Sequence, residues 1–365
     1  MGVWILFLSA LKGLKPFNLL IEAEDTLKTD KKLTLADLAK LAGVSTSTAS
    51  RALNDNPVIK KATRDKIKAL ANKYNFSINA AASRLRTQKT NVIAVILNLI
   101  DHTEQSISDP FLLKVVGELN QALNDKGYEL LLSNSFMASD DWANYFLSSS
   151  RADGIIVVGQ GKSDEKIDAV ARTGLPMVVW GDPTSDVDYT VVGSDNKLGG
   201  YLATKHLIDS GCKNIVFLGD TEHLELAERH KGYRQALSEA GGVLEDRLTL
   251  SIDITSTAAY EKISETILHH GLFFDGIVTS SDMVALGALK ALKERYIGIP
   301  SEVAIVGFDD IAMAELFHPS LTTIRQNIKE AAEVMVNQLV NQFEGKPSHS
   351  AVIDLELIPR NSTRH

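Results

Sequence analysis

The chain has 365 residues, enough for two or three domains with cores of their own, and its 44% apolar and 23% charged residues are ordinary for a soluble globular protein. The net charge of −8 is uneven, because residues 31–90 carry +10 and the remainder carries −18. This asymmetry predicts that only one end of the chain meets a polyanion, and the single cysteine, Cys212, excludes an internal disulfide and fits a reducing cytoplasm.

Residues 1–31 form an N-terminal extension that contains the apolar run VWILFLSAL (3–11). This run is far shorter than the roughly 20 residues that span a bilayer. No Lys or Arg precedes it and no small-x-small cleavage site follows, which disfavours a secretory signal peptide. Two interpretations remain, namely an unstructured extension and a start codon assigned too far upstream.

Residues 32–78 are predicted to form three short helices. Thr34, Ser45 and Thr63 are expected to cap them, because a hydroxyl at the N-cap accepts a hydrogen bond from a free backbone N–H. Between the first two helices, Gly43 can supply the positive φ that a tight turn demands. Two steeply crossing helices joined by such a turn form a helix-turn-helix.

The segment LTLADLAKLAGVSTSTASRALN (33–54) has the spacing of a helix-turn-helix that reads DNA. Its expected shared core consists of Leu38, Ala42, Val44, Ala49 and Ala52. The second helix is expected to turn outward on one face Thr46, Ser47, Ser50 and Arg51. In such motifs the second helix lies in the major groove. The alternative is an ordinary helical hairpin with a solvated face.

From residue 91 onward, apolar runs of strand length alternate with helical patterns. The nine runs are 91–97, 128–134, 154–159, 176–181, 189–193, 214–219, 248–253, 276–280 and 303–310. Continuous apolar strands between helices predict parallel sheets buried on both faces, and nine strands suit two doubly wound lobes. A ligand is then expected beyond the carboxyl ends of the strands, in a cleft between the lobes.

Over about residues 33–364 the sequence resembles the lactose-repressor/galactose-repressor (LacI/GalR) family of bacterial transcription regulators. The resemblance rests on TLADLAKLAGVSTSTASRALN, TRDKIKALANKYNF, NAAASRLR, VGSDNKLGGYLATKHLIDSG, ERHKGY, SSDMVALGALKAL, VAIVGFDD and PSLTTIRQN. It implies an all-α helix-turn-helix headpiece with a hinge helix, followed by an α/β two-lobed periplasmic-binding-protein-like domain of two doubly wound parallel sheets.

The resemblance also divides the chain. The headpiece is expected at 32–78, the hinge helix and linker at 79–90, and the effector-binding and dimerisation domain at 91–365. Within the last, the N-lobe is expected at about 91–210 and 327–355, and the C-lobe at about 211–323 and 356–365.

By the same resemblance, Thr46, Ser47 and Arg51 would read base edges, and Arg51 suits a bidentate contact to guanine O6 and N7. Residues that would hold phosphates or register are Thr34, Ser45, Ser50, Asn54 and Thr63. The hinge would contribute Asn79, Ala82 and Leu85, with Leu85 as an apolar wedge in the minor groove. Ile78 stands where the family usually has Pro.

The effector would lie against Phe111, Trp180, Asp195, Arg229, Ser281, Asp309 and Gln326. The Asp309 carboxylate would accept hydrogen bonds from sugar hydroxyls, and Arg229 would donate to them. Ser281 stands where many sugar-binding members have Asn, and Asp282 is an alternative cap for the following helix. Trp180 is either a platform for a sugar ring or a structural core residue.

These features predict a cytoplasmic, homodimeric repressor of carbohydrate-utilisation genes that binds double-stranded operator DNA and a sugar effector. The open alternatives are a non-sugar effector such as a purine, and a transport receptor, which has no use for a helix-turn-helix. Catalytic residues and a cofactor are not expected, because the sequence has no G-x-S-x-G and no H-E-x-x-H, and GQGKS (159–163) lacks the first Gly of a phosphate loop, with Ile156 in its place. A metal is not expected, because the nine His show no ligand spacing. The chain shows no membrane-spanning run and no leucine-heptad tail of the kind that would make tetramers.

Overall fold

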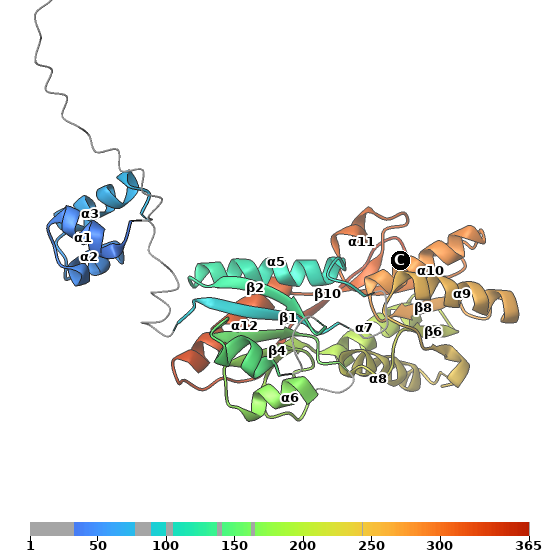
Figure 1. Cartoon of the computed structure of the whole chain (residues 1–365). Coiled ribbons are helices and arrows are strands. Elements are labelled where there is room, and N and C mark those ends of the chain that lie inside the picture. Colours follow the sequence, from blue (N-terminus) through green and yellow to red (C-terminus); the bar gives the residue numbers. More distant parts are fainter. Residues whose placement is uncertain are drawn as a thin grey trace, which may run out of the picture. The chain divides into compact units, whose positions relative to one another are not determined.

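The structure is a computed structural model that describes residues 33–76, 89–99, 105–136, 141–161, 165–242 and 244–364. The chain divides into two units, Met1–Thr87 and Gln88–His365 (Figure 1). The expected N-terminal extension and the expected hinge helix, apart from Lys89 and Thr90, lie outside the described residues. Among the described helices, none is both long and apolar enough to cross a lipid bilayer.

Three helices form the described part of the first unit, α1 (Leu35–Ala42), α2 (Thr46–Leu53) and α3 (Lys61–Lys73). Thr34 caps α1 in a capping box, in which the Asp37 backbone N–H donates to Thr34 and the Thr34 N–H donates to Asp37. Gly43 ends α1 with a φ of 72°, and the Ser45 hydroxyl accepts the Thr48 N–H at 3.2 Å. Two of the three expected caps and the expected turn are therefore confirmed.

The headpiece core confirms four of the five expected positions as buried, and Val44 is partly buried. Helix α3 closes this core with Ile67 and Ala71. Two expectations were wrong. Helix α3 begins at Lys61 with Lys60 as its N-cap, so Thr63 lies inside the first turn and caps nothing. Ser50 is only 8% exposed, because α2 packs against both α1 and α3 and buries a wider sector than one stripe.

The first sheet of the second unit holds six strands in the order β11-β5-β4-β3-β1-β2, and every neighbouring pair is parallel. They are β1 (Val92–Leu97), β2 (Glu129–Asn134), β3 (Gly154–Val158), β4 (Met177–Trp180), β5 (Thr190–Ser194) and β11 (Ala351–Ile353). Alternate residues of β1 pack on opposite faces. One face meets α5 (Pro110–Asp125) and α12 (Ile328–Phe343), and the other meets a π-helix (Ala143–Ser148) and α6 (Glu165–Arg172) (Figure 1).

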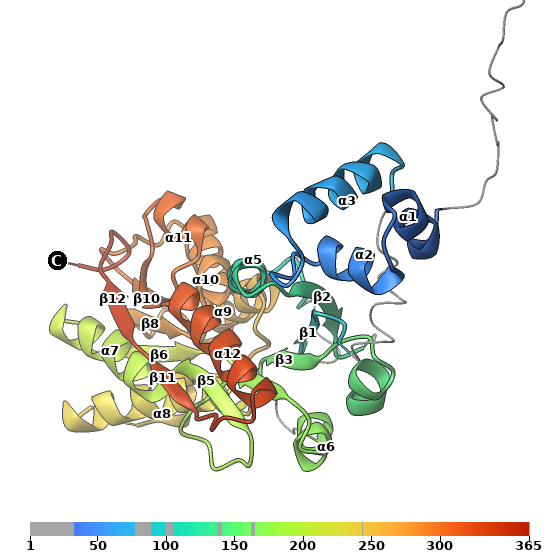
Figure 2. The same ribbon diagram turned by 90° about the vertical axis from the view of Figure 1, so that its left-hand side faces the viewer.

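The second sheet has the order β12-β10-β9-β8-β6-β7. Its strands are β6 (Ile215–Leu218), β7 (Thr249–Leu250), β8 (Gly276–Thr279), β9 (Ala304–Asp309), β10 (Thr322–Gln326) and β12 (Leu355–Ile358). Helices α7 (Asn196–Asp209) and α8 (Leu224–Glu239) cover one face, side by side (Figure 2). The other face meets α9 (Ser256–His270) and α10 (Asp282–Glu294), with α11 (Ala312–Leu316) nearby.

The nine expected strands are all present, and the two-lobed doubly wound fold is confirmed. Three strands, β10, β11 and β12, were not expected, and β12 pairs with β10 antiparallel, so the second sheet is not purely parallel. The expected N-lobe range 91–210 is too long, because Ala203 and Leu207 of α7 pack into the second lobe against Phe217. The chain thus crosses between lobes after β5, between β10 and α12, and between β11 and β12.

Candidate DNA-reading helix and effector cleft

Helix α2 presents three exposed polar side chains, Thr46, Ser47 and Arg51. Within the part of the chain that the structure describes, no hydrogen bond or ion pair holds the Arg51 guanidinium. The Ser45 hydroxyl caps α2 and lies 2.9 Å from the Ser47 hydroxyl. Asn54 ends α2, and its side-chain amide donates to the Ser50 carbonyl at 3.0 Å. The short hydroxyls of Thr46 and Ser47 therefore lie in the first turn of α2, and the long cation of Arg51 lies in its last turn.

Several headpiece cations instead hold the domain together. Arg64 donates to the Ile59 carbonyl at 2.7 Å, and Lys66 donates to the Ala42 carbonyl at 3.1 Å. Lys68 pairs with Asp55 at 2.6 Å. The exposed Lys68–Asp55 pair contributes little to stability, so its main effect is to reduce the charge available to a polyanion. The expected hinge contacts Asn79, Ala82 and Leu85 lie outside the described residues.

A cavity of about 100 Å³ lies at the carboxyl ends of the strands, between the two lobes. The first lobe contributes Asn98, Gln105, Phe111, Leu112, Val158, Gly159, Gly161 and Trp180, and the second contributes His223, Glu225, Leu226, Arg229, Ile254 and Asp309. Four of the seven expected effector residues therefore line one cavity, in the position expected for doubly wound sheets.

Arg229 and Asp309 bring a buried pair of opposite charges to the cavity lining. Arg229 stands on α8 and is 6% exposed, whereas Asp309 ends β9 and is 5% exposed. The Arg229 Nη1 atom lies 3.8 Å from Asp309 Oδ1. The Arg229 Nε donates to Asn196 Oδ1 at 2.9 Å, and Nη1 also donates to the Ser280 carbonyl. Protein partners thus fix the guanidinium before any ligand arrives.

Burial dominates the electrostatics of this pair. It raises the pKa of Asp309 well above its ordinary value, although Arg229 acts to lower it and Asp282 to raise it further. Burial likewise lowers the pKa of Arg229, against the opposing effect of Asp309. Asp309 also has a φ of 115°, a strained conformation for a residue other than glycine. Strain and desolvation at one residue are typical of a functional site.

The other three expected effector residues do not line the cavity, and each forms a hydrogen bond within the protein instead. Asp195 caps α7 by accepting the Leu198 N–H at 2.8 Å. Ser281 caps α10 by accepting the Val284 N–H, so the alternative that Asp282 is the cap was wrong. Gln326 is buried and donates from Nε2 to Asp309 Oδ1 at 2.8 Å, which orients that carboxyl group.

Asp282 is buried inside the second lobe. Its carboxyl accepts the Thr323 hydroxyl at 2.6 Å and the Ile311 N–H at 2.9 Å. Burial raises its pKa to about 7, although these hydrogen bonds act to lower it. Its role is to tie α10 to β10 and to the chain that follows β9.

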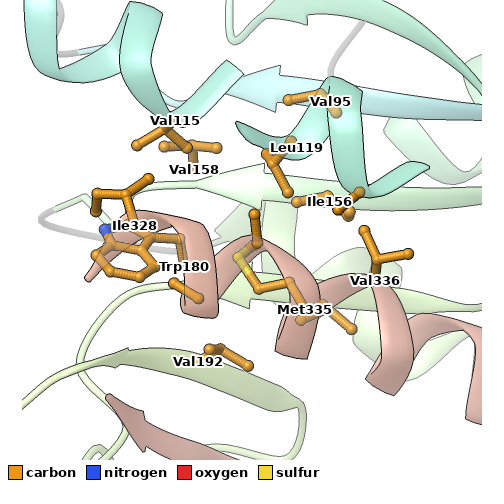
Figure 3. Packing of buried hydrophobic residues seen from close by; sticks show 14 of the residues in the cluster. Val95, Val115, Leu119, Ile156, Val158, Trp180, Val192, Ile328, Met335 and Val336 are labelled. Carbon is orange, nitrogen blue, oxygen red and sulfur yellow. The ribbon is translucent and has the colours of Figure 1, made fainter. Parts of the chain in front are cut away.

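Trp180 is a structural core residue that also lines the cavity, and its role as a platform for a sugar ring stays a prediction. Its indole is 6% exposed and packs in the first-lobe core beside Ile328 and Val158 (Figure 3). It also lines the cavity, with its ring centre 6.4 Å from that of Phe111 at an interplanar angle of 52°. A core residue thus offers one edge to the cleft.

Sequence patterns missed the polar residues that complete the lining, above all Asn98, His223 and Glu225. Asn98 follows β1 and His223 follows β6 closely, so the rule that ligands bind at the carboxyl ends of parallel strands could have found them. The His223 ring lies 2.7 Å from Asp220 through Nδ1. Glu225 lies in the first turn of α8, where an acidic residue usually indicates only a favourable helix terminus.

Comparisons with known proteins agree with this geometry. The profile "Bacterial regulatory proteins, lacI family" matches residues 34–79, and the profile "Periplasmic binding protein-like domain" matches residues 204–363. The chain is 30% identical over 335 residues to the HTH-type transcriptional regulator RegA of Clostridium saccharobutylicum, covering 90% of this chain and 98% of that protein. It is 29% identical over 342 residues to the HTH-type transcriptional repressor PurR of Haemophilus influenzae strain PittGG, covering 91% and 98%.

Solved structures show the same fold. The Lac repressor dimer bound to operator and the anti-inducer ONPF matches with a TM-score of 0.81 at 22% identity, over 92% of this chain and all of that one. A complex of the transcriptional regulator CelR with cellobiose matches with a TM-score of 0.68 at 25% identity, over 90% of this chain and 99% of that one.

Proposed function

The chain belongs to the LacI family of bacterial transcriptional regulators, and we propose that it is a cytoplasmic repressor of carbohydrate-utilisation genes controlled by a sugar in its cleft. The observation that carries the effector class is the shared cavity of Arg229, Asp309 and Trp180. It offers a fork of donors, a carboxyl acceptor and an aromatic edge, the groups that suit sugar hydroxyls and a sugar ring. The similarity to the CelR–cellobiose complex supports this choice.

On DNA, each protomer would place α2 in the major groove of one half-site. Arg51 would then read a guanine, with Thr46 and Ser47 beside it, while Thr34, Ser45, Asn54 and Thr63 would hold phosphates or register. A homodimer would match a pseudo-palindromic operator. Leu85, outside the described residues, would kink the central step. Ligand-dependent movement of the lobes would decide whether the paired hinges fold on DNA.

A face of the second lobe is suited to the homodimer. Leu316 at the end of α11 is 81% exposed, and Phe317 beside it is 39% exposed. Phe317 lines the groove between α9, α10 and α11, and Leu316 precedes it in the chain. Leu316→Asp should shift sedimentation from dimer toward monomer, with the exposed Leu268→Asp as a control on α9. An unchanged dimer would place the interface elsewhere.

The regulatory function is tested by gel-shift measurements on DNA upstream of the chain's own gene. Arg51→Ala should weaken binding to the operator by about 1–3 kcal/mol and relax the preference at one base pair. Lys73→Ala, at the far end of α3, is a control for loss of positive charge. Equal losses of affinity for operator and for random DNA would contradict base reading by Arg51. If none of the upstream fragments shows salt-sensitive binding, the proposed regulatory function is rejected.

A purine effector is the second candidate, favoured by the Phe111–Trp180 pair, which could also enclose a flat base. A calorimetric screen of sugars and purines separates the two. Binding of purines alone would reject the sugar. Effector binding without any DNA binding would instead favour a transport receptor.

A further inference from the structure

Glu225 lies where the two lobes meet. It belongs to α8 of the second lobe, lines the cavity and is partly buried. Its Oε1 accepts the backbone N–H of Gln160, which follows β3 in the first lobe, at 3.1 Å. This hydrogen bond therefore crosses the cleft.

The first-lobe end of this bond is held rigidly. Gln160 is fully buried, and its Oε1 accepts the Asp182 N–H at 2.6 Å. Its Nε2 donates to the Ser185 hydroxyl at 3.2 Å and to the Tyr189 hydroxyl at 3.3 Å. Because Gln160 is fixed in this way, the hydrogen bond to Glu225 depends on the distance between the two lobes and not on independent movement of a loop.

We propose that Glu225 is a specificity-determining residue of the cleft, which joins the lobes through Gln160 and reserves the cavity for an uncharged ligand that donates a hydroxyl hydrogen bond. This inference rests on the proposed ligand role of the cleft. A carboxylate offers about four acceptor positions, of which the Gln160 N–H uses one. A ligand hydroxyl can take another and so stabilise the closed lobes.

The charges around Glu225 select against anions. Glu225 and Asp309 both line the cavity, and burial raises the pKa of each, while Arg229 acts to lower both. One guanidinium, already held by protein partners, thus faces two carboxyl groups. Burial already opposes negative charge on these two carboxyl groups, so the poorly solvated site also disfavours a phosphate or carboxylate on the ligand. Such an anion would in addition be repelled by Glu225 when that group is ionised.

A simpler explanation is that Glu225 only favours the N-terminus of α8, as acidic residues in a first turn do. That role requires neither the bond to Gln160 nor a place in the cavity lining. It also predicts no effect of Glu225 on which ligands bind. Ligand selectivity therefore separates the two explanations.

Selectivity is measured by titration calorimetry with glucose, maltose and cellobiose, each beside its 6-phosphate or 6′-phosphate ester. Wild type should bind at least one neutral sugar about 100-fold more tightly than its phosphate ester. This factor corresponds to the repulsion between two unit negative charges roughly 6 Å apart at an effective dielectric constant of about 20. Glu225→Gln should narrow this ratio about tenfold or more. Glu228→Gln on the same helix, whose carboxylate pairs with Lys231, should leave it unchanged. Equal binding of ester and sugar, or an unchanged ratio in Glu225→Gln, would overturn the proposal.

The joining of the lobes is measured by hydrogen exchange without ligand. Glu225→Ala should speed exchange of the Gln160 amide about tenfold, whereas Glu228→Ala should not. Equal exchange in wild type and Glu225→Ala would refute the bridge. If no sugar binds, the proposed charge selection and the proposed sugar effector are both rejected. Operator binding by the wild type that is lost in Arg51→Ala would still support the proposed regulatory function.

Discussion

The guanidinium carbon of Arg229 lies 3.6 Å from the centre of the Phe308 ring. Phe308 precedes Asp309 on β9 and is 1% exposed, so one strand supplies both the ring that supports the guanidinium and the carboxyl beside it. A cation over an aromatic face is attracted to it and loses orientational freedom. Phe308 thus positions Arg229 without lining the cavity.

Phe308→Leu should therefore lower effector affinity about three- to tenfold, because the loss of about 0.5–1.5 kcal/mol of cation–ring attraction frees Arg229. Calorimetric titration measures this change. Phe217→Leu is the matched control, since Phe217 is buried in the same core and packs on His230 and Tyr233. Similar affinity losses in both variants would mean that general loosening of the core, and not the ring under Arg229, is responsible.

The close contact of α7 and α8 should make Gly200 intolerant of any side chain. A Cβ at Gly200 would lie 2.0 Å from the Arg229 carbonyl oxygen, and backbone atoms cannot yield there without moving Arg229. We expect Gly200→Ala to lower the free energy of unfolding by about 1–3 kcal/mol or more, measured by urea denaturation, and to weaken effector binding. Gly117→Ala in α5 meets open space and should raise stability by about 0.5–1 kcal/mol. Two equally stable variants would contradict this packing.

The Ser45 cap should stabilise α2 measurably in the whole protein. Ser45→Ala removes the acceptor for the Thr48 N–H and should destabilise α2 by about 1 kcal/mol. Hydrogen exchange of the α2 amides should accelerate accordingly. Lys60→Ala, at an N-cap without a side-chain hydrogen bond, should change exchange in α3 little. Unchanged exchange in the Ser45 variant would show that tertiary packing alone holds α2.

The Asp220–His223 pair should contribute stability that depends on pH. Burial acts to raise the pKa of Asp220, but hydrogen bonds from His223 and from the Glu222 N–H outweigh it and lower the pKa to about 2. A depressed carboxyl pKa stabilises the fold above the unfolded value of 3.8 and loses that effect as the pH falls through about 2. Asp220→Asn should cost about 2 kcal/mol at pH 6 and progressively less between about pH 4 and pH 2, by urea denaturation. A cost independent of pH would contradict the shift, and Asp209→Asn is the exposed control.

Most local features of this protein follow from its sequence alone, although the start of α3 at Lys61, ahead of the expected cap Thr63, does not. The caps at Thr34 and Ser45, the turn at Gly43 and the nine apolar strands were all predictable, because each signal lies within a few residues of the feature it produces. The same is true of Arg229 and Asp309 as cleft residues, since the resemblance carries them at fixed motif positions. That the two would meet within 3.8 Å needed the folded chain.

Tertiary contacts decided the rest. Strands β10 and β12 are short and partly polar, so they became visible only through their pairing. Ser50 is buried on α2, which packs against both α1 and α3, and α7 joins the second lobe because Phe217 and Phe308 pack against it. Glu225 looks like an ordinary first-turn acid until Gln160, 65 residues away, supplies the partner across the cleft. Local hydrogen bonds and apolar runs fix the elements, whereas a residue's part in the site depends on which distant surface is packed against it.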